Sequence, residues 1–248
     1  MGVAMAKEKQ IGKKRIWELD FIRGVAIIGV VFVHVVYDLT SIFGMDFSLG
    51  PVFDAVQNYG SLIFIVLSGI CVTLGRHNIK RGLVVLLCGG VISGVTYLMV
   101  YLDMLSKYAK IDFGILSCLG ACMILYSLFK GANKYLVLFS AVVFIALGFM
   151  LKDYRVDDNY LAFLGIRSAS YSAGDYFPLL PNFGYFLVGV FIGRTAYKNK
   201  KTLMPFVKDT NPIVRIFGFL GRQSLWVYMI HQPLAYGVLY LIFEIIKK

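Results

Sequence analysis

One stretch near the N-terminus constrains this chain more than any other. Residues 20–39 are apolar enough and long enough for a membrane-spanning helix, yet they include Asp20, Arg23, His34 and Asp38. Ionisable side chains inside a span are costly, so they usually face the protein interior or a wet cavity. On an α-helix, Arg23 and His34 share one face about 16 Å apart, and Asp38 follows His34 by one turn. We therefore predict a polar face with a cation near one membrane surface and a His–Asp pair deeper in the span.

The composition of the whole chain agrees with a membrane protein. Of its 248 residues 58% are hydrophobic and 16% are charged, which excludes a disordered chain and disfavours a water-soluble domain. The net charge of +11 would suggest nucleic acid in a soluble protein, but positive charge also collects in cytoplasmic loops of membrane proteins. We therefore expect the lipid bilayer as a partner and no nucleic acid. The four cysteines all fall within apolar runs, so we expect neither a disulfide framework nor a metal site.

The apolar runs predict an all-α fold, a polytopic integral membrane helix bundle of about seven spans. The number becomes eight if one helix is split or re-entrant. Residues 1–19 are expected to form a basic cytoplasmic arm, and residues 20–248 a single transmembrane domain. The expected spans are about 20–39, 58–75, 82–102, 113–129, 135–151, 183–197 and 223–246, with an interfacial helix at 212–220.

The distribution of positive charge predicts the orientation. With a cytoplasmic N-terminus, most lysines and arginines fall in cytoplasmic segments, as expected for a multi-pass protein of the plasma membrane. The longest polar segment, residues 152–182, then lies outside and ends in a turn between Pro178 and Pro181. Because such long connections are usually functional, we expect this segment to form a rim or lid over an acceptor site.

Several motifs resemble one family. Arg23 and His34 form an Arg-x10-His pattern that is typical of a superfamily of membrane acyltransferases. The surrounding sequence RIWELDFIRGVAI looks like the opening of the heparan-alpha-glucosaminide N-acetyltransferase catalytic-domain family. Further pieces follow in the family's order over nearly the whole chain. They are Phe64–Gly69, Phe113–Leu116, Asp175–Pro181 with Gly184, Leu220–Leu225, and Tyr228–Pro233.

The resemblance implies acyl transfer from cytoplasmic acyl-CoA, here acetyl-CoA, to a polar acceptor such as a glycan on the other side of the membrane. The lysosomal members have more helices and a large luminal loop, so their glycosaminoglycan substrate is not carried over. In members that resemble the lysosomal enzyme, Asn can replace His34 and a catalytic His follows in the next loop. Residues 40–57 contain no histidine, so in this chain the role falls on His34.

The chemistry assigns candidate roles to the polar residues. Acyl transfer needs a base or a nucleophile, and an imidazole can serve as either, with Asp38 to orient it. Asn58, at the outer start of the second span, is expected at the same depth and is the third catalytic candidate. The candidates for binding the phosphates of CoA are Arg23, Arg76, Arg81, Arg194 and Arg222, and those for binding the acceptor are Asp175, Asn182 and His231.

Two alternatives compete with the acyltransferase. In a membrane transporter or proton-coupled carrier, His34 and Asp38 would form a proton relay. The absence of an internal repeat and the family pattern disfavour it. A light-sensing seven-helix protein is excluded because the last span has no central lysine to bind retinal. The sequence leaves open the acceptor, the acyl chain length, O- or N-transfer, a direct or acetyl-histidine route, and whether the chain forms a homo-oligomer.

Overall fold

A computed structural model describes residues 15–47, 49–104, 106–207 and 211–246 of the chain. Within these ranges the regular structure is helical. The only β-type pairings there are two isolated bridges, Phe113 with Tyr176 and Arg155 with Arg167. This confirms the predicted all-α fold. Residues 1–14 of the expected basic arm lie outside the described residues.

Among the described residues, five helices are long and apolar enough to cross a membrane: α2 with the π-helical η1, α3, α4, α6 and α9. The α5–η3 unit is apolar but shorter. The chain thus carries several membrane-spanning helices, while seven spans and a cytoplasmic N-terminus stay predictions. The main elements are α2 (Trp17–Tyr37), η1 (Asp38–Ile42), α3 (Pro51–Leu74), α4 (Asn78–Tyr101), α5 (Ile115–Leu125), η3 (Tyr126–Phe129), α6 (Lys134–Leu151), α7 (Leu179–Thr195), α8 (Pro212–Arg222) and α9 (Ser224–Ile246).

Three expected helix starts were wrong, and one of them is that of α4, which begins at Asn78 rather than near residue 82. Helix α3 begins at Pro51 rather than near residue 58, because proline lacks the N–H that would be unpaired in a first helical turn and its fixed φ suits that position. Gly50 precedes it with a φ of 79°, a left-handed conformation that favours glycine. Helix α7 begins at Leu179 rather than at 183, so Asn182 belongs to the helix and not to the preceding segment.

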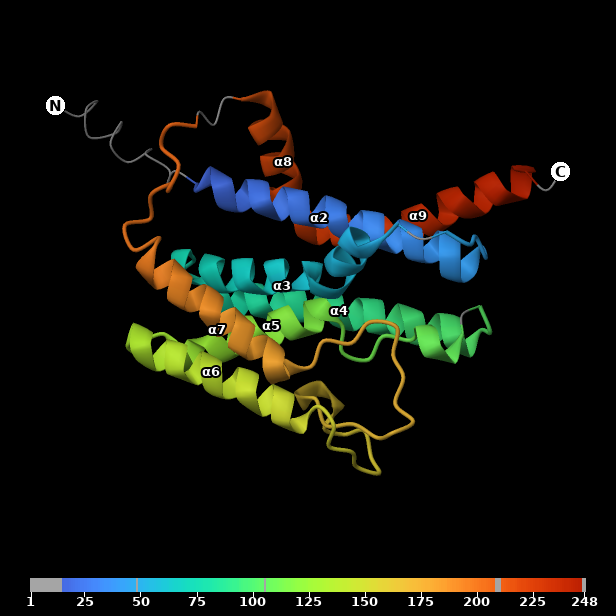
Figure 1. The fold of residues 1–248 in the computed structure, drawn as a ribbon, viewed down its shortest axis with the longest axis horizontal. Coiled ribbons are helices and arrows are strands. Elements are labelled where there is room, and N and C mark those ends of the chain that lie inside the picture. Colours follow the sequence, from blue (N-terminus) through green and yellow to red (C-terminus); the bar gives the residue numbers. More distant parts are fainter. Residues whose placement is uncertain (1–14, 48, 105, 208–210, 247–248) are drawn as a thin grey trace.

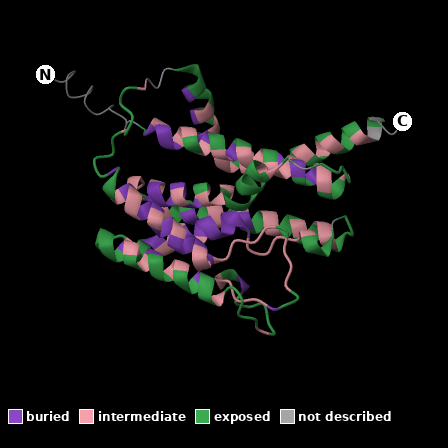
Figure 2. Cartoon of the chain, viewed as in Figure 1, coloured by how far each residue is buried: buried purple, intermediate pink, exposed green. Residues whose placement is uncertain are grey.

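The helices form two groups (Figure 1). Helices α2, α8 and α9 make one group, and α3 to α7 make the other. Buried residues concentrate in the middle of the second group (Figure 2), where Ile65, Cys118, Phe186 and Val190 are almost fully buried. Large apolar side chains cover much of the exposed surface, as expected for a surface that faces lipid.

Two glycines bring α2 and α8 into backbone contact. A Cβ atom at Gly24 of α2 would overlap the carbonyl oxygen of Phe217, and a Cβ atom at Gly221 of α8 would overlap that of Asp20. Small residues allow helix backbones to approach this closely, which favours packing inside a membrane.

Helix α9 begins beside this contact and runs in the same general direction as α2, crossing it at an angle (Figure 1). The rings of His34 and His231 lie 4.9 Å apart, and further along the rings of Phe43 and Phe243 stack at 4.4 Å. The glycine contact at the start of α9 therefore fixes which residues of α9 face α2.

We predict that Gly24→Ala destabilises the protein, because the added methyl group has no space against the Phe217 backbone. Overpacking of this kind costs roughly 1–3 kcal/mol. Gly29→Ala, on the same helix, is the matched control because nothing lies within 4 Å of its Cβ position. Thermal unfolding in detergent should show a lower melting temperature for Gly24→Ala alone. Equal melting temperatures for the two variants would contradict the close packing of α2 and α8.

Candidate active site

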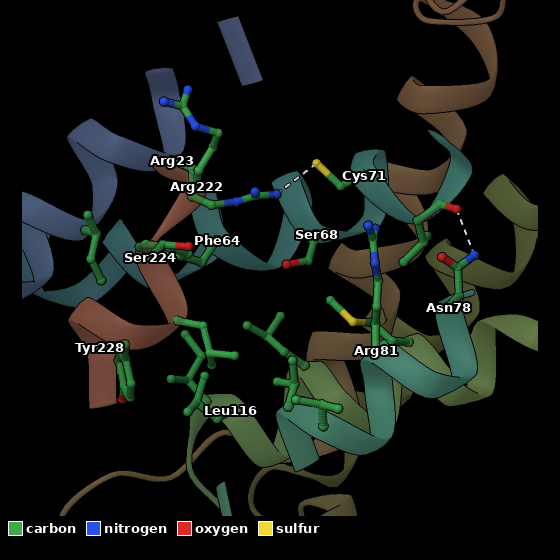
Figure 3. Close-up of a pocket in the computed structure, with 18 of the residues that line it drawn as sticks. Arg23, Phe64, Ser68, Cys71, Asn78, Arg81, Leu116, Arg222, Ser224 and Tyr228 are labelled. Carbon is green, nitrogen blue, oxygen red and sulfur yellow. Dashed lines mark hydrogen bonds between the residues drawn. The ribbon is translucent and has the colours of Figure 1, made fainter. Parts of the chain in front are cut away.

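A cavity of about 430 Å³ lies where α2 and the start of α9 face α3, α4 and α5 (Figure 3). Its walls are largely apolar and include Ile27 and Val30 of α2, Phe64 of α3 and Leu116 of α5. The cavity is thus bounded by both helix groups, and it can hold a narrow, mostly apolar part of a ligand.

One end of the cavity is cationic. Arg23, Lys80, Arg81 and Arg222 line it, and they come from three different helices. Figure 3 shows Arg23 reaching from α2 to α3, where its Nη2 donates a hydrogen bond of 2.9 Å to Sγ of Cys71. Several cations at one opening favour a ligand with negative charge, and arginine suits phosphate especially well.

A second hollow of about 770 Å³ lies between the start of α2 and α8. Arg15 and Arg215 line it together with the aromatic residues Trp17 and Phe219. Arg222 lines both this hollow and the cavity, so the two spaces share a cation.

The other end of the cavity is closed by Tyr228 of α9, whose hydroxyl donates to Oδ2 of Asp175 at 3.5 Å. The same oxygen accepts the backbone N–H of Ile115, at the start of α5, at 3.2 Å. Burial raises the pKa of Asp175 to about 6, although both hydrogen bonds act in the opposite direction. Asp175, in the segment before α7, is therefore held beside Tyr228 and Ile115 at the inner end of the cavity, the end away from the cations.

The helix faces that line the cavity continue to two histidines. Arg23, Ile27 and Val30 follow one another at helical spacing on α2, and His34 comes one turn after Val30. On α9, His231 comes three residues after Tyr228, and the two rings lie 5.1 Å apart. Because the rings of His34 and His231 are neighbours, the structure brings two histidines together just past the inner end of the cavity.

Asp38 has a partner that the sequence did not indicate. It is fully buried, and its Oδ1 accepts a hydrogen bond of 2.8 Å from Nε2 of Gln232 on α9. The sequence predicts that Asp38 orients His34, but in the structure its carboxyl accepts its hydrogen bond from α9. The only signal for Gln232 was its place between His231 and Pro233 in the last span.

Two of the predicted polar residues have other surroundings. Asn58 is exposed on α3 and does not line the cavity. Asn182 is buried, and its Nδ2 donates to the carbonyl of Pro178 at 2.7 Å, which braces the first turn of α7.

Two of the predicted phosphate-binding arginines also lie apart from the cavity lining. Arg76 is exposed in the turn between α3 and α4. Arg194 donates to the carbonyls of Ala132 and Phe129, at 2.5 and 2.6 Å, after the end of α5. A cation is favourable at a helix C-terminus, so this position of Arg194 has a structural explanation.

Comparison with known protein families places these features in context. The sequence model of the heparan-alpha-glucosaminide N-acetyltransferase catalytic family matches residues 15–233, a range that contains every residue lining the cavity. No curated protein and no solved structure matches the chain significantly. Since the match covers most of the chain, the chain belongs to the heparan-alpha-glucosaminide N-acetyltransferase catalytic family.

Proposed function

We propose that this member of an acetyltransferase family transfers an acetyl or other short acyl group from cytoplasmic acyl-CoA to a hydroxyl or amine of a polar, sugar-like acceptor outside. The observation that carries the proposal is the cavity itself. The cavity is cationic at one end, its mouth, and has mostly apolar walls along the rest. The faces of α2 and α9 that line it continue to the His34–His231 pair.

The donor fits the two spaces, which share Arg222 in their linings, in one direction. Phosphate groups of CoA would bind Arg23, Arg81 and Arg222 at the mouth, where guanidinium groups can form paired hydrogen bonds. The second hollow, with its cations and aromatic rings, would hold the nucleotide part. The thin pantetheine arm would then occupy the apolar part of the cavity, with the thioester toward Tyr228 and the histidines.

His34 would supply the chemistry as a base or as the acyl carrier. The acceptor must lose a proton while it attacks the thioester, or the imidazole must first take the acyl group. Either route forms a new bond to the acyl carbon and releases CoA as a thiolate. The apolar walls exclude water from this region, which strengthens the electrostatic interactions there.

A proton-coupled carrier is the second candidate, because paired histidines and a buried carboxyl between α2 and α9 could also relay protons. Purified protein in nanodiscs distinguishes the two functions. An acyltransferase releases free CoA thiol from acetyl-CoA and labels an acceptor. A protein that releases no thiol but moves protons in liposomes would contradict the proposed enzyme.

We predict that His34→Ala lowers acyl transfer by roughly 10²- to 10⁴-fold, the usual loss when a general base is removed. The control is His77→Ala, which removes an exposed histidine from the turn before α4. Both variants should bind acetyl-CoA and unfold at the wild-type temperature. Near-normal turnover of His34→Ala would refute the catalytic role.

We predict that Arg23→Ala weakens donor binding and raises the Michaelis constant for acetyl-CoA roughly ten- to hundredfold, as expected for one lost charge-assisted hydrogen bond. Arg155→Ala is the control, because it removes a cation from the segment before α7. Titration of acetyl-CoA at two salt concentrations, by equilibrium binding and by initial rate, measures the dissociation constant and the Michaelis constant. Equal affinities in the two variants would place the phosphates elsewhere.

We predict that the wild type gains stability relative to its Asp175→Asn variant as the pH falls from 7 to 4. The folded protein takes up this proton near pH 6, whereas an unfolded chain does so near pH 4. Between these values the folded state binds more protons, so stability rises as pH falls from 7 to 4. Melting temperatures of the two proteins across this range test the sign. A difference that is independent of pH would show that the carboxyl is not buried as described.

A further inference from the structure

Three polar side-chain atoms are buried without a hydrogen-bond partner between α2 and α9. They are Oδ2 of Asp38, Nε2 of His231 and Oε1 of Gln232. The Asp38 residue is 0% exposed and the His231 residue 8% exposed. Buried polar groups are nearly always paired, because an unpaired one loses its hydrogen bonds to water without replacement. These three atoms are gathered where η1 meets α9, and a ligand with donor groups there would complete their hydrogen bonding.

The chemistry of these atoms identifies what is missing. Nδ1 of His231 lies 2.6 Å from the carbonyl oxygen of Tyr228, which can only accept, so Nδ1 carries the proton. Nε2 of the neutral ring is then a lone pair. Gln232 donates its amide nitrogen to Asp38, so its unpaired atom is the carbonyl oxygen. All three atoms are hydrogen-bond acceptors, and their absent partner must therefore bring donors.

The position of the cluster relates it to the donor cavity. The ring of His231 is 5.1 Å from that of Tyr228, which closes the cavity, and 4.9 Å from that of His34. A molecule held by the cluster would thus lie next to the thioester of a donor that fills the cavity.

We propose that the acyl acceptor binds between α2 and α9 by donating its O–H or N–H groups to Asp38 and Gln232, and that Nε2 of His231 takes the proton of the attacking group. This inference rests on the proposed function. With His231 as the base, the role left for His34 is that of acyl carrier. A ring nitrogen of His34 bonds to the acyl carbon as the carbon–sulfur bond breaks, and CoA leaves as a thiolate. The acceptor oxygen or nitrogen then bonds to the acyl carbon as the bond to His34 breaks, and the proton that Nε2 of His231 takes is available to the thiolate.

Two variants test the two parts of the proposal. His231→Asn keeps a donor for the Tyr228 carbonyl but lacks Nε2. Gln232→Met keeps the length of the side chain but removes both polar atoms. Ser93→Ala is the matched control, because its hydroxyl is also buried and unpaired but lies on α4, outside the cavity lining. CoA release in nanodiscs would be measured with water, glycerol and glucosamine as acceptors, beside equilibrium binding of acetyl-CoA.

The expected kinetics distinguish a site that binds the acceptor from one that binds the acyl-CoA donor. Gln232→Met should raise the Michaelis constant for glycerol or glucosamine about tenfold or more, the size of a lost hydrogen bond. His231→Asn should lower kcat about 10²-fold or more with every acceptor. Both should bind acetyl-CoA like the wild type, and Ser93→Ala should match the wild type throughout. Normal kinetics in both variants, or a parallel loss of acetyl-CoA binding, would overturn the inference.

Failure of the proposed function gives a different result, because the wild type would then release no CoA with any acceptor, and both proposals would fall. If a variant does not fold, ¹⁵N NMR of the wild type in liposomes decides. The chain has three histidines, so the His231 signals can be assigned. A proton on Nδ1 and none on Nε2 supports the inference. A proton on Nε2 of the neutral ring overturns it.

Discussion

The close contact between α2 and α8 determines how the polar residues of this membrane protein meet. Gly24 and Gly221 leave no side chain between the two backbones, so the start of α9 is held at one height along α2. His34 follows Gly24 by ten residues, and His231 follows Gly221 by ten residues. Along α2, ten residues at 1.5 Å each place His34 about 15 Å beyond Gly24. His231 reaches the same level through the end of α8, the junction at Gln223 and the first two turns of α9. The glycine pair thus positions a site that it does not touch.

Helical periodicity was enough to predict one side of the site, but not the other. The spacing within residues 20–38 placed Arg23 and His34 on one face, and the structure has that face lining the cavity and then reaching the second histidine. That His231 lies beside His34 depends on how α8 and α9 are placed along α2, and Gly24 and Gly221 set that placement. The chain has 25 glycines, and no local sequence pattern distinguishes these two from the others. Asp38 shows a second limit. It opens the π-helical η1, whose wider turn changes the phase of the helix, and its carboxyl meets Gln232 on α9.

The segment between α6 and α7 shows why long-range pairing escapes sequence reasoning. Its acids and its length predict an outer rim, but no pattern in the sequence indicates a partner for Asp175. In the structure the chain around Asp175 runs beside the start of α5, where the N–H of Phe177 donates to the carbonyl of Phe113 at 2.9 Å. The carboxyl is thereby held at the N-terminus of α5, where negative charge is favourable, and beside Tyr228. Sixty residues separate Asp175 from Ile115, and only the folded chain brings them together.

The polarity of the two ends has a consequence for any two-substrate reaction in this cavity. The mouth offers cations, which attract a polyanionic donor and repel a protonated amine. The cluster between α2 and α9 offers only unpaired acceptors, which favour hydroxyl or amine donors and disfavour phosphate. Between them the apolar walls keep the dielectric low, so these preferences are stronger than they would be in water. Under the proposed function, each substrate would therefore be rejected at the end that suits the other, and the two could meet only beside the histidine pair.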